Sequence, residues 1–145
     1  MSKILNISDA ASIALHAMVI LATDPCDVLS ATELASMIDV SEAHLSKVLQ
    51  RLSKAGLVDS VRGPKGGYKI CDAHKSVTLL DVYTAIEGPI GKADCLLKAR
   101  VCDGKTCILG GLINHLNKKV GDYLSKTRII ELAKAFSFSG KEQTN

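Results

Sequence analysis

Three of the five cysteines lie close together in the sequence, and they are the side chains with the clearest potential for chemistry. Cys95, Cys102 and Cys107 fall within thirteen residues, with six and then four residues between successive thiols. Glycine in this stretch gives the backbone the freedom to turn, so the three thiols can converge on one centre. The basic residues between them stabilise thiolates, the form of cysteine that binds metals. The segment is therefore predicted to be a metal-binding or redox-active loop.

The spacing of these thiols favours one kind of metal centre. A structural zinc site usually has four ligands in two pairs, with roughly two to four residues between the members of a pair. The loop has no such pair and no fourth ligand close by. Soft thiolates also suit an iron–sulphur cluster, which tolerates wider spacing. A cluster is the favoured centre, and the alternative is unligated cysteines that pack as small apolar side chains. Cys26 and Cys71 are far away in sequence and are interpreted as unligated.

The composition indicates a single, mainly helical domain. Hydrophobic residues make up 47% of the 145 residues, aromatic residues make up 3%, and Trp is absent. Such a set of Leu, Ile, Val and Ala is typical of helices that pack on helices. No apolar run approaches the roughly 20 residues that span a bilayer, and residues 1–6 lack the features of a secretory signal. The expected location is the cytoplasm, where disulfides are rare. The net charge of +3 permits nucleic-acid binding.

The first half of the chain predicts three helices. Ser8 can cap a helix over residues 9–23, in which apolar residues recur at helical spacing. A short helix over residues 32–37 follows, and after a tight turn Ser41 caps a third helix to about residue 55. Two helices joined by such a short turn form the helix-turn-helix unit of many DNA-binding proteins.

The third helix has an apolar face and a basic face. The apolar positions are Leu45, Val48, Leu49 and Leu52, and the basic positions opposite them are His44, Lys47, Arg51 and Lys54. A buried apolar stripe with a basic stripe opposite suits a recognition helix that lies in the major groove of DNA. A solvated amphipathic helix is the alternative for this helix taken alone.

The segment after this helix predicts a β-hairpin with a basic tip. Residues 57–61 and 68–70 have the composition of short strands, and a tip rich in glycine joins them. The glycines let the backbone approach a surface closely, and Arg62 and Lys65 can meet phosphates or the minor groove. This order of elements predicts a winged helix-turn-helix domain. The predicted DNA-binding residues are Ser41, Glu42, His44, Lys47, Arg51, Lys54, Arg62, Lys65, Gly66, Gly67 and Tyr68.

The second half of the chain predicts a dimer interface. A helix over residues 79–87, capped by Thr78, precedes the cysteine loop, and a long helix follows from about Gly110. One face of the long helix carries Leu112, Leu116, Val120 and Leu124. One small domain has little core left to cover this stripe, so a second copy of the chain is expected to cover it in a homodimer.

These elements define a mainly α fold with a small β-hairpin wing and a long C-terminal dimerisation helix. The DNA-binding region is assigned to residues 1–75, and the dimerisation helices are assigned to residues 76–136 with the cluster-binding loop at residues 92–110. Residues 129–132 form a last short helical segment. The polar residues 137–145 are expected to be a disordered tail.

The whole arrangement resembles the IscR/NsrR/RirA type of winged-helix regulators, the Rrf-type family, known for sensing iron–sulphur status, nitric oxide, iron or redox state. The resemblance runs from Ile7 to about Ala135. Its most specific pieces are Ala14-Leu15-His16-Ala17, Ser41-Glu42-Ala43-His44-Leu45-Ser46-Lys47-Val48-Leu49, and the wing Arg62-Gly63-Pro64-Lys65-Gly66-Gly67-Tyr68. The cysteine loop follows at the position where cluster-binding members carry theirs.

The resemblance implies a cofactor and most of its ligands. Cys95, Cys102 and Cys107 would each ligate an iron–sulphur cluster, either 2Fe–2S or 4Fe–4S, with one cluster per subunit. The six-and-four spacing departs from the five-and-five spacing of the best-known members. Gly110 stands where some members have a histidine ligand after the last cysteine, so that ligand is absent.

Some members of the resembling family take a further ligand from the first helix of the partner subunit. Ser12 stands where some carry an acidic ligand, and a hydroxyl is a poor ligand for iron. His16, one turn later, is the favoured fourth ligand; the alternative is an ordinary helix histidine with a hydrogen-bonded ring. Asp9, His115 and a solvent or small-molecule ligand are weaker candidates.

The sequence as a whole predicts a DNA-binding transcription regulator, specifically a repressor. It is expected to bind a pseudo-palindromic operator in double-stranded DNA as a homodimer, with no membrane partner and with an affinity that the cluster controls. One alternative is the same dimer without a cluster, sensing oxidants through thiol chemistry. A second alternative is an electron-transfer or enzymatic iron–sulphur protein. The sequence has no nucleotide-binding glycine motif and no nucleophile-and-base pair, so catalysis is not expected.

Overall fold

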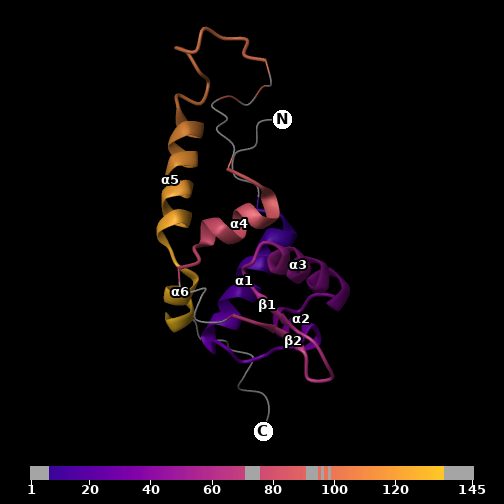
Figure 1. Cartoon of the computed structure of the whole chain (residues 1–145). Helices are drawn as coiled ribbons and strands as arrows, with labels where there is room; N and C mark the ends of the chain where they lie inside the picture. Colours follow the sequence, from indigo (N-terminus) through magenta and orange to yellow (C-terminus); the bar gives the residue numbers. More distant parts are fainter. Residues whose placement is uncertain (1–6, 71–75, 91–94, 96, 98, 136–145) are drawn as a thin grey trace.

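The computed structural model describes residues 7–70, 76–90, 95, 97 and 99–135. Its elements in chain order are α1 (Asp9–Thr23), α2 (Ala31–Ile38), α3 (Glu42–Lys54), β1 (Asp59–Val61), β2 (Gly67–Lys69), α4 (Leu79–Glu87), α5 (Leu112–Lys126) and α6 (Ile129–Ala135). Figure 1 shows α1, α2, α3 and the hairpin gathered in one body, with α4 crossing between this body and α5. The mainly α fold with one small hairpin confirms the predicted fold class. The predictions for Cys71 and for the tail at residues 137–145 lie outside the described residues.

Serine caps start the first and third helices where the sequence predicts them. The Ser8 hydroxyl accepts the Ala11 N–H at 3.1 Å at the start of α1, and the Ser41 hydroxyl accepts the His44 N–H at 3.2 Å at the start of α3. Each cap satisfies one of the amide groups that the first turn of a helix leaves without a partner.

The second helix begins one residue earlier than the sequence predicted. Ser30 and Glu33 form a capping box, in which the Glu33 N–H donates to the Ser30 hydroxyl at 3.1 Å and the Ser30 N–H donates to the Glu33 carboxylate at 2.8 Å. This reciprocal pair fixes Ser30 as the cap and Ala31 as the first helical residue. The helix ends at Ile38, one residue later than predicted, and the left-handed φ of 62° at Asp39 closes the turn toward α3.

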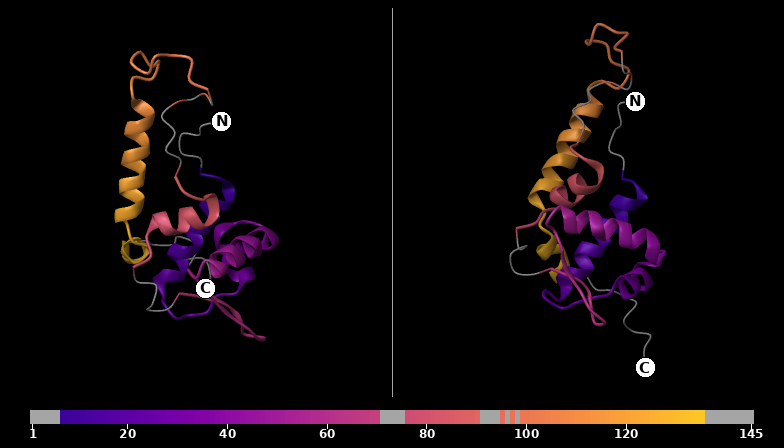
Figure 2. Two further views of the ribbon diagram at one scale, coloured as in Figure 1. Left: turned by 45° about the horizontal axis from the view of Figure 1, so that its top comes forward. Right: turned by 45° about the vertical axis from the view of Figure 1, so that its right-hand side comes forward.

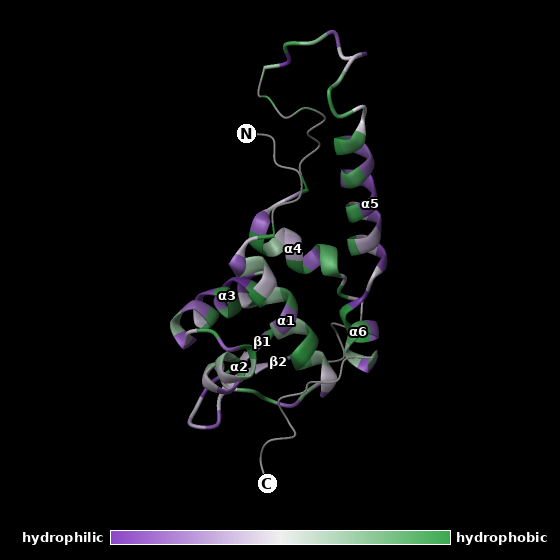
Figure 3. Ribbon diagram, turned by 180° about the vertical axis from the view of Figure 1, so that it is seen from behind, coloured by the Kyte–Doolittle hydropathy of each residue, from purple (hydrophilic) through white to green (hydrophobic). Residues whose placement is uncertain are grey.

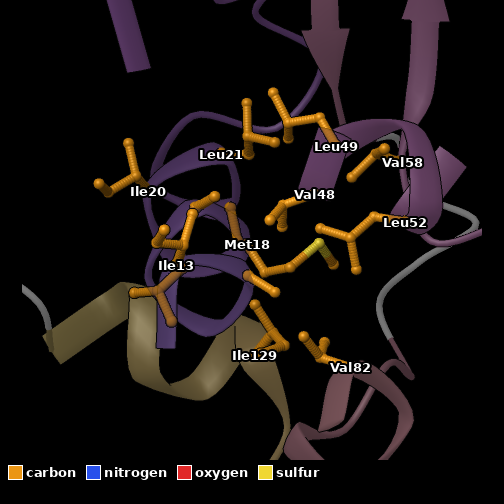
Figure 4. Packing of buried hydrophobic residues seen from close by; sticks show 14 of the residues in the cluster. Ile13, Met18, Ile20, Leu21, Val48, Leu49, Leu52, Val58, Val82 and Ile129 are labelled. Carbon is orange, nitrogen blue, oxygen red and sulfur yellow. The ribbon is translucent and has the colours of Figure 1, made fainter. Parts of the chain in front are cut away.

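The core of the molecule is built around α1. Ala14, Ala17 and Met18 of this helix have no exposed surface. Figure 4 shows Met18 among Val48 and Leu52 of α3, Val82 of α4 and Ile129 of α6. The predicted apolar face of the third helix is therefore buried as expected, and α1 holds α3, α4 and α6 in one packed unit.

The first strand of the hairpin is two residues shorter than predicted, the second begins and ends one residue earlier, and the hairpin has a third partner. Its strands pair antiparallel with Ser60 opposite Tyr68. Leu57 is not in the first strand, because its N–H donates to the Leu52 carbonyl at 3.0 Å and so belongs to the C-terminal turn of α3. Leu29, in the loop before α2, exchanges two backbone hydrogen bonds of 3.0 and 2.8 Å with Tyr68. The base of the wing is thus joined to the loop that precedes α2.

The predicted bounds of the helix before the cysteine loop are confirmed. Thr78 caps α4 through a reciprocal pair with Asp81, and Gly88 ends the helix with a φ of 80°. Two backbone hydrogen bonds of 2.9 Å join the start of α4 to the end of α5. The Leu79 N–H donates to the Thr127 carbonyl, and the Ile129 N–H donates to the Val77 carbonyl. None of the helices in the described residues is long and apolar enough to cross a membrane.

The far part of α5 extends beyond α4, as both views in Figure 2 show. Leu124 of the predicted apolar stripe is buried, Leu116 and Val120 are half-buried, and Leu112 is 46% exposed. In Figure 3 the hydrophobic bands of α5 lie on one side of the helix and the hydrophilic bands on the other. The chain itself therefore covers the stripe at one end of α5 and leaves it open toward the other.

Candidate DNA-binding surface and cysteine loop

The basic face of α3 is exposed, as the helical wheel predicted. The four basic residues His44, Lys47, Arg51 and Lys54 are exposed, while the apolar face of the same helix is buried. Between α3 and the hairpin lies a hollow of about 560 Å³. Its lining residues are Lys47, Gln50, Arg51, Ser53, Lys54, Ser60 and Tyr68. Positive charge beside hydroxyl groups suits a phosphate backbone.

Sequence reasoning missed three residues of this hollow. Gln50 and Ser53 lie on α3 and Ser60 on β1, and all three are polar lining residues. Helical spacing could have predicted the position of Gln50, because at 100° per residue it lies about 60° from Lys47 around the helix axis. Ser60 had no such signal, since its place beside α3 depends on how the hairpin packs.

The first turn of α3 has a structural and a predicted functional role. Ser41 caps the helix, and Glu42 places a negative charge at the positive end of the helix dipole. Ser41, Glu42 and His44 are all exposed. All three side chains are therefore accessible for the predicted DNA contacts. The capping bond is a second reason, independent of DNA, for a serine at position 41.

Arg51 differs from the other basic residues of α3. Its guanidinium donates a hydrogen bond to the Ile86 carbonyl in the last turn of α4. Lys47 and Lys54 have no corresponding bond to α4 among the hydrogen bonds of the described residues. The helical wheel placed Arg51 with the lysines, but its side chain reaches a neighbouring helix. Its assignment as a DNA contact remains a prediction.

The wing presents Arg62 and Lys65 to solvent. Its glycines are constrained from inside the protein: a Cβ on Gly66 would come within 2.3 Å of the Val61 carbonyl oxygen, and a Cβ on Gly67 within 2.2 Å of the Leu29 carbonyl oxygen. The sequence analysis explained these glycines by close approach of the backbone to DNA. Packing inside the protein is a further reason why glycine is required at both positions. Their roles as DNA contacts remain predictions.

The cysteine loop lies at the far end of α5, away from the hairpin (Figures 1 and 2). Cys102 is exposed, and Cys95 and Cys107 are half-buried. The Leu97 N–H donates to Cys95 Sγ at 3.5 Å, and the Leu109 N–H donates to Cys107 Sγ at 3.4 Å. Amide hydrogen bonds of this kind stabilise negative charge on sulphur and tune iron–sulphur clusters.

The surroundings of Cys107 favour its thiolate. The Leu109 N–H is the largest cause that lowers the pKa of the Cys107 thiol below its ordinary value. The Gly110 and Gly111 amides and the charge of Arg100 act in the same direction, while partial desolvation opposes them. A thiolate is the form that binds iron, so Cys107 is suited to act as a ligand.

A tight turn separates the last two thiols. One carboxylate oxygen of Asp103 accepts the Lys105 N–H at 2.8 Å and the Thr106 N–H and hydroxyl at 3.1 Å each. These donors lower the pKa of Asp103, with the Lys105 amide as the largest cause. Gly104 has a left-handed φ of 82°, which favours glycine. These hydrogen bonds and Gly104 bend the chain between Cys102 and Cys107.

His16 is exposed on α1, and its ring is oriented by a hydrogen bond. Nδ1 lies 2.7 Å from the Ser12 carbonyl oxygen. Because a carbonyl oxygen only accepts, Nδ1 carries the proton and Nε2 of the neutral ring keeps a free lone pair. This arrangement is the one that orients many metal-binding histidines. Asp9 and His115, the weaker candidates, are also exposed.

The predicted ligands do not come together within one chain. Among the described residues, no three His, Cys, Asp or Glu side chains lie close enough to hold one metal ion. The donor set nevertheless fits an iron–sulphur cluster, since it offers soft sulphurs and amide donors to two of them. Three thiols also leave one position for a ligand from elsewhere.

Comparison with known proteins gives the family. The Rrf2 family, described as "Iron-dependent Transcriptional regulator", matches residues 7–135. The putative HTH-type transcriptional regulator BadM of Rhodopseudomonas palustris is 45% identical over 73 residues, which cover 50% of this chain and 47% of BadM. The HTH-type transcriptional regulator IscR of Vibrio campbellii is 34% identical over 96 residues, which cover 66% of this chain and 56% of IscR. The chain thus spans about half the length of these curated relatives.

The fold agrees with a solved structure. The structure of CymR (YrzC), "the Global Cysteine Regulator of B. subtilis", matches with a TM-score of 0.77 and 27% sequence identity, covering 92% of this chain and 99% of CymR. The winged-helix architecture is therefore confirmed. The relatives are named as transcriptional regulators, which is a regulatory and not an enzymatic role.

The match over nearly the whole chain confirms the resemblance drawn from the first-helix, recognition-helix and wing motifs. The basic face of α3 and the adjacent hairpin have the order and position of a winged DNA-binding surface. The chain belongs to the Rrf2 family of transcriptional regulators.

Proposed function

We propose that this chain is a cytoplasmic homodimeric repressor whose operator affinity is controlled by an iron–sulphur cluster, with one cluster per subunit. Cys95, Cys102 and Cys107 would hold the cluster, and His16 of the partner subunit would supply the fourth ligand. The observation that carries the proposal is the loop of three thiols at the end of α5, in which backbone amides donate to two of the sulphurs. The similarity to IscR of Vibrio campbellii supports it.

The dimer is inferred from two apolar surfaces of the same chain. The stripe on α5 is open toward its far end, where Leu112 is 46% exposed. An apolar hollow of 400 Å³ lies between α1, α4 and α6, lined by Leu15, His16, Val19, Leu79, Leu132 and Ala135. If each copy places its α5 stripe over the hollow of the other, both surfaces are buried around a two-fold axis.

This arrangement also explains the proposed fourth ligand. His16 borders the apolar hollow of α1, α4 and α6. A partner α5 seated over that hollow would bring its own cysteine loop toward α1. The hydrogen bond from Nδ1 to the Ser12 carbonyl leaves Nε2 available to such a loop. The ligand set that is incomplete within one chain would then be completed across the dimer.

The DNA-binding part of the proposal rests on α3 and the wing. In a two-fold dimer, two α3 helices would enter successive major grooves of a pseudo-palindromic operator, and the Arg62 and Lys65 side chains would grip the flanking backbone. Lys47 and Lys54 line the hollow between α3 and the hairpin. Phosphate contacts from these lysines would supply affinity with a steep dependence on salt.

The cysteine loop would act as the sensor. When bound, an iron–sulphur cluster supplies a centre that oxidants, nitric oxide and iron shortage can alter. The chain's own part is to hold the loop through its thiolates, the Asp103 turn and the partner subunit's His16. A loop released from these constraints would change the angle between the two DNA-binding regions. A coupling of about 1–3 kcal/mol would change operator affinity about 5- to 150-fold.

The test is made on protein purified without oxygen. Its visible absorption spectrum, iron and acid-labile sulphide are measured, and operator affinity is determined before and after removal of iron. The proposal expects a coloured protein with both elements present, lost in Cys102→Ala but retained in Cys26→Ala, because Cys26 is an exposed cysteine away from the loop. A colourless protein after reconstitution with iron and sulphide would overturn the cluster.

A second candidate is a regulator of the same fold that senses oxidants directly through thiols. The exposed thiol of Cys102 and the lowered pKa of Cys107 favour such chemistry. Similarity to CymR, named a global cysteine regulator, also supports it. This candidate predicts no iron in anaerobically prepared protein, and a disulfide that forms with peroxide, weakens operator binding and is reversed by dithiothreitol.

A further inference from the structure

Arg51 of the recognition helix is bonded to the end of another helix. Its guanidinium Nη2 donates to the Ile86 carbonyl oxygen at 2.5 Å. Ile86 lies in the last turn of α4, where helix carbonyls have no intrahelical partner and the helix dipole is negative. A guanidinium is a fitting partner for such a carbonyl, because it supplies both a donor and positive charge. Arg51 therefore caps α4 from a neighbouring helix.

The position of Arg51 on α3 explains why it differs from the lysines. Lys47 and Lys54 are seven residues apart and so lie nearly on one line of the helix. Arg51 is displaced by about 40° from Lys47 at 100° per residue. That displacement brings its guanidinium within reach of the end of α4, where Val82 and Ile86 are buried. Arg51 remains exposed and also lines the hollow that it shares with Lys47 and Lys54.

The end of α4 is held from two sides. Next to Ile86, the Glu87 carboxylate accepts a hydrogen bond from the Ser8 hydroxyl, which also caps α1. The following residues are Gly88, which ends the helix with a left-handed φ of 80°, and Pro89. In sequence these two residues lead directly to the cysteine segment. Hydrogen bonds from α3 and from the start of α1 thus both hold the C-terminal end of α4, which precedes the cysteine segment in sequence.

We propose that Arg51 is a positioning residue that fixes the recognition helix relative to the end of α4, and that it does not contact phosphate. Displacement of that helix end then moves α3 through the Arg51–Ile86 bond. The positioning role stands on the geometry of the chain. The transmission of the cluster state through it rests on the proposed function.

The experiment uses the full chain with and without cluster, and three variants. Arg51→Met removes the donor and keeps the length of the side chain, Arg51→Lys keeps one donor and the charge, and Lys54→Met is the matched control on the same helix. Operator affinity is measured over a range of salt concentrations, so that each protein gives an affinity ratio between the two cluster states and a salt slope. Thermal unfolding identifies any variant that fails to fold.

The proposal expects Arg51→Met to keep the wild-type salt slope while its affinity ratio between the cluster states falls toward one. Arg51→Lys should regain part of that ratio. Lys54→Met should lower the slope by about 0.9, the value for one phosphate contact on B-DNA, and keep the ratio. An Arg51→Met variant with the slope of Lys54→Met and an unchanged ratio would overturn the proposal.

Failure of the proposed function is recognised separately. A wild-type chain with equal operator affinity in both states, or with no cluster, removes the cluster-dependent function. The role of Arg51 is then decided by two measurements on Arg51→Met: the salt slope, and the ratio of its affinities for operator and unrelated DNA. An unchanged slope with reduced discrimination in Arg51→Met supports the positioning role. A lowered slope overturns it.

Discussion

The carbonyl oxygen of Leu29 lies 2.2 Å from the point that a Cβ on Gly67 would occupy. Leu29 cannot easily withdraw, because two backbone hydrogen bonds with Tyr68 hold it. The start of β2 therefore excludes every side chain through contact with the protein's own backbone. The loop before α2 and the wing are fitted together at this position.

Replacement of Gly67 by Ala should reduce stability. The added methyl group forces Leu29 and Tyr68 apart, and overpacking of this kind costs about 1–3 kcal/mol. Gly121→Ala is the control, because that glycine lies inside α5 with nothing within 4 Å of its would-be Cβ. It should stabilise the chain by up to about 1 kcal/mol. Urea unfolding of both variants makes the comparison, and a neutral Gly67→Ala would contradict the packing argument.

Two substitutions at Ser41 should separate its cap from its predicted DNA contact. Ser41→Ala removes the acceptor of the His44 N–H and should cost about 1 kcal/mol of stability. Ser41→Asp keeps a capping oxygen, so stability should stay near wild type, while the new negative charge repels phosphate and weakens operator binding. Unfolding and DNA titration are run on the same preparations. Equal DNA affinity in Ser41→Asp and wild type would remove Ser41 from the DNA surface.

Neutralising Lys47 should weaken binding to all DNA sequences. Each lost phosphate contact lowers the salt slope by about 0.9 on B-DNA, so Lys47→Gln should reduce affinity for operator and unrelated DNA alike. Lys118→Gln, an exposed lysine on α5, should leave the slope unchanged. Fluorescence anisotropy at several salt concentrations gives the slopes. A change confined to the operator would instead indicate a base contact by Lys47.

The stability of α6 should depend on acid pH through one ion pair. The Arg128 guanidinium donates to Glu131 at 2.9 and 2.7 Å, and this bond is the largest cause that lowers the pKa of Glu131. A carboxyl whose folded pKa is lowered contributes stability above its unfolded pKa and loses it as pH falls through the folded pKa. Glu131→Gln should therefore be less stable than wild type at pH 7 and equal to it at strongly acid pH. Urea midpoints across that range provide the measurement, and a constant difference at every pH would contradict this origin.

Local signals made much of the fold predictable. The caps at Ser8, Ser41 and Thr78 and the glycine at residue 88 placed four helix boundaries, because each depends on residues within one turn. The second helix was predicted one residue too short at each end, and its start was missed because the Ser30–Glu33 capping box was not recognised. Leu57 was assigned to a strand, although its amide closes the end of α3.

The parts that could not be predicted depend on contacts between distant segments. Nothing near Arg51 in the sequence indicates that its side chain reaches Ile86, 35 residues later. Nothing near Gly67 indicates that the Leu29 carbonyl lies against it. The cysteine spacing predicted a ligand loop, but the three thiols of one chain do not by themselves form a closed site among the described residues.

The attachment of α5 has a mechanical consequence. Its 15 residues correspond to a rod about 22 Å long at 1.5 Å per residue. Backbone hydrogen bonds at Thr127 and Ile129 anchor one end of this rod, and the thiols lie beyond the other. A tilt of about 10° at the anchored end displaces the far end of such a rod by about 4 Å. α5 thus acts as a lever arm that turns a small tilt at its anchored end into a larger movement of the thiols. In the reverse direction, a small force on the thiols produces a larger force at the anchored end, where α5 is bonded to the start of α4.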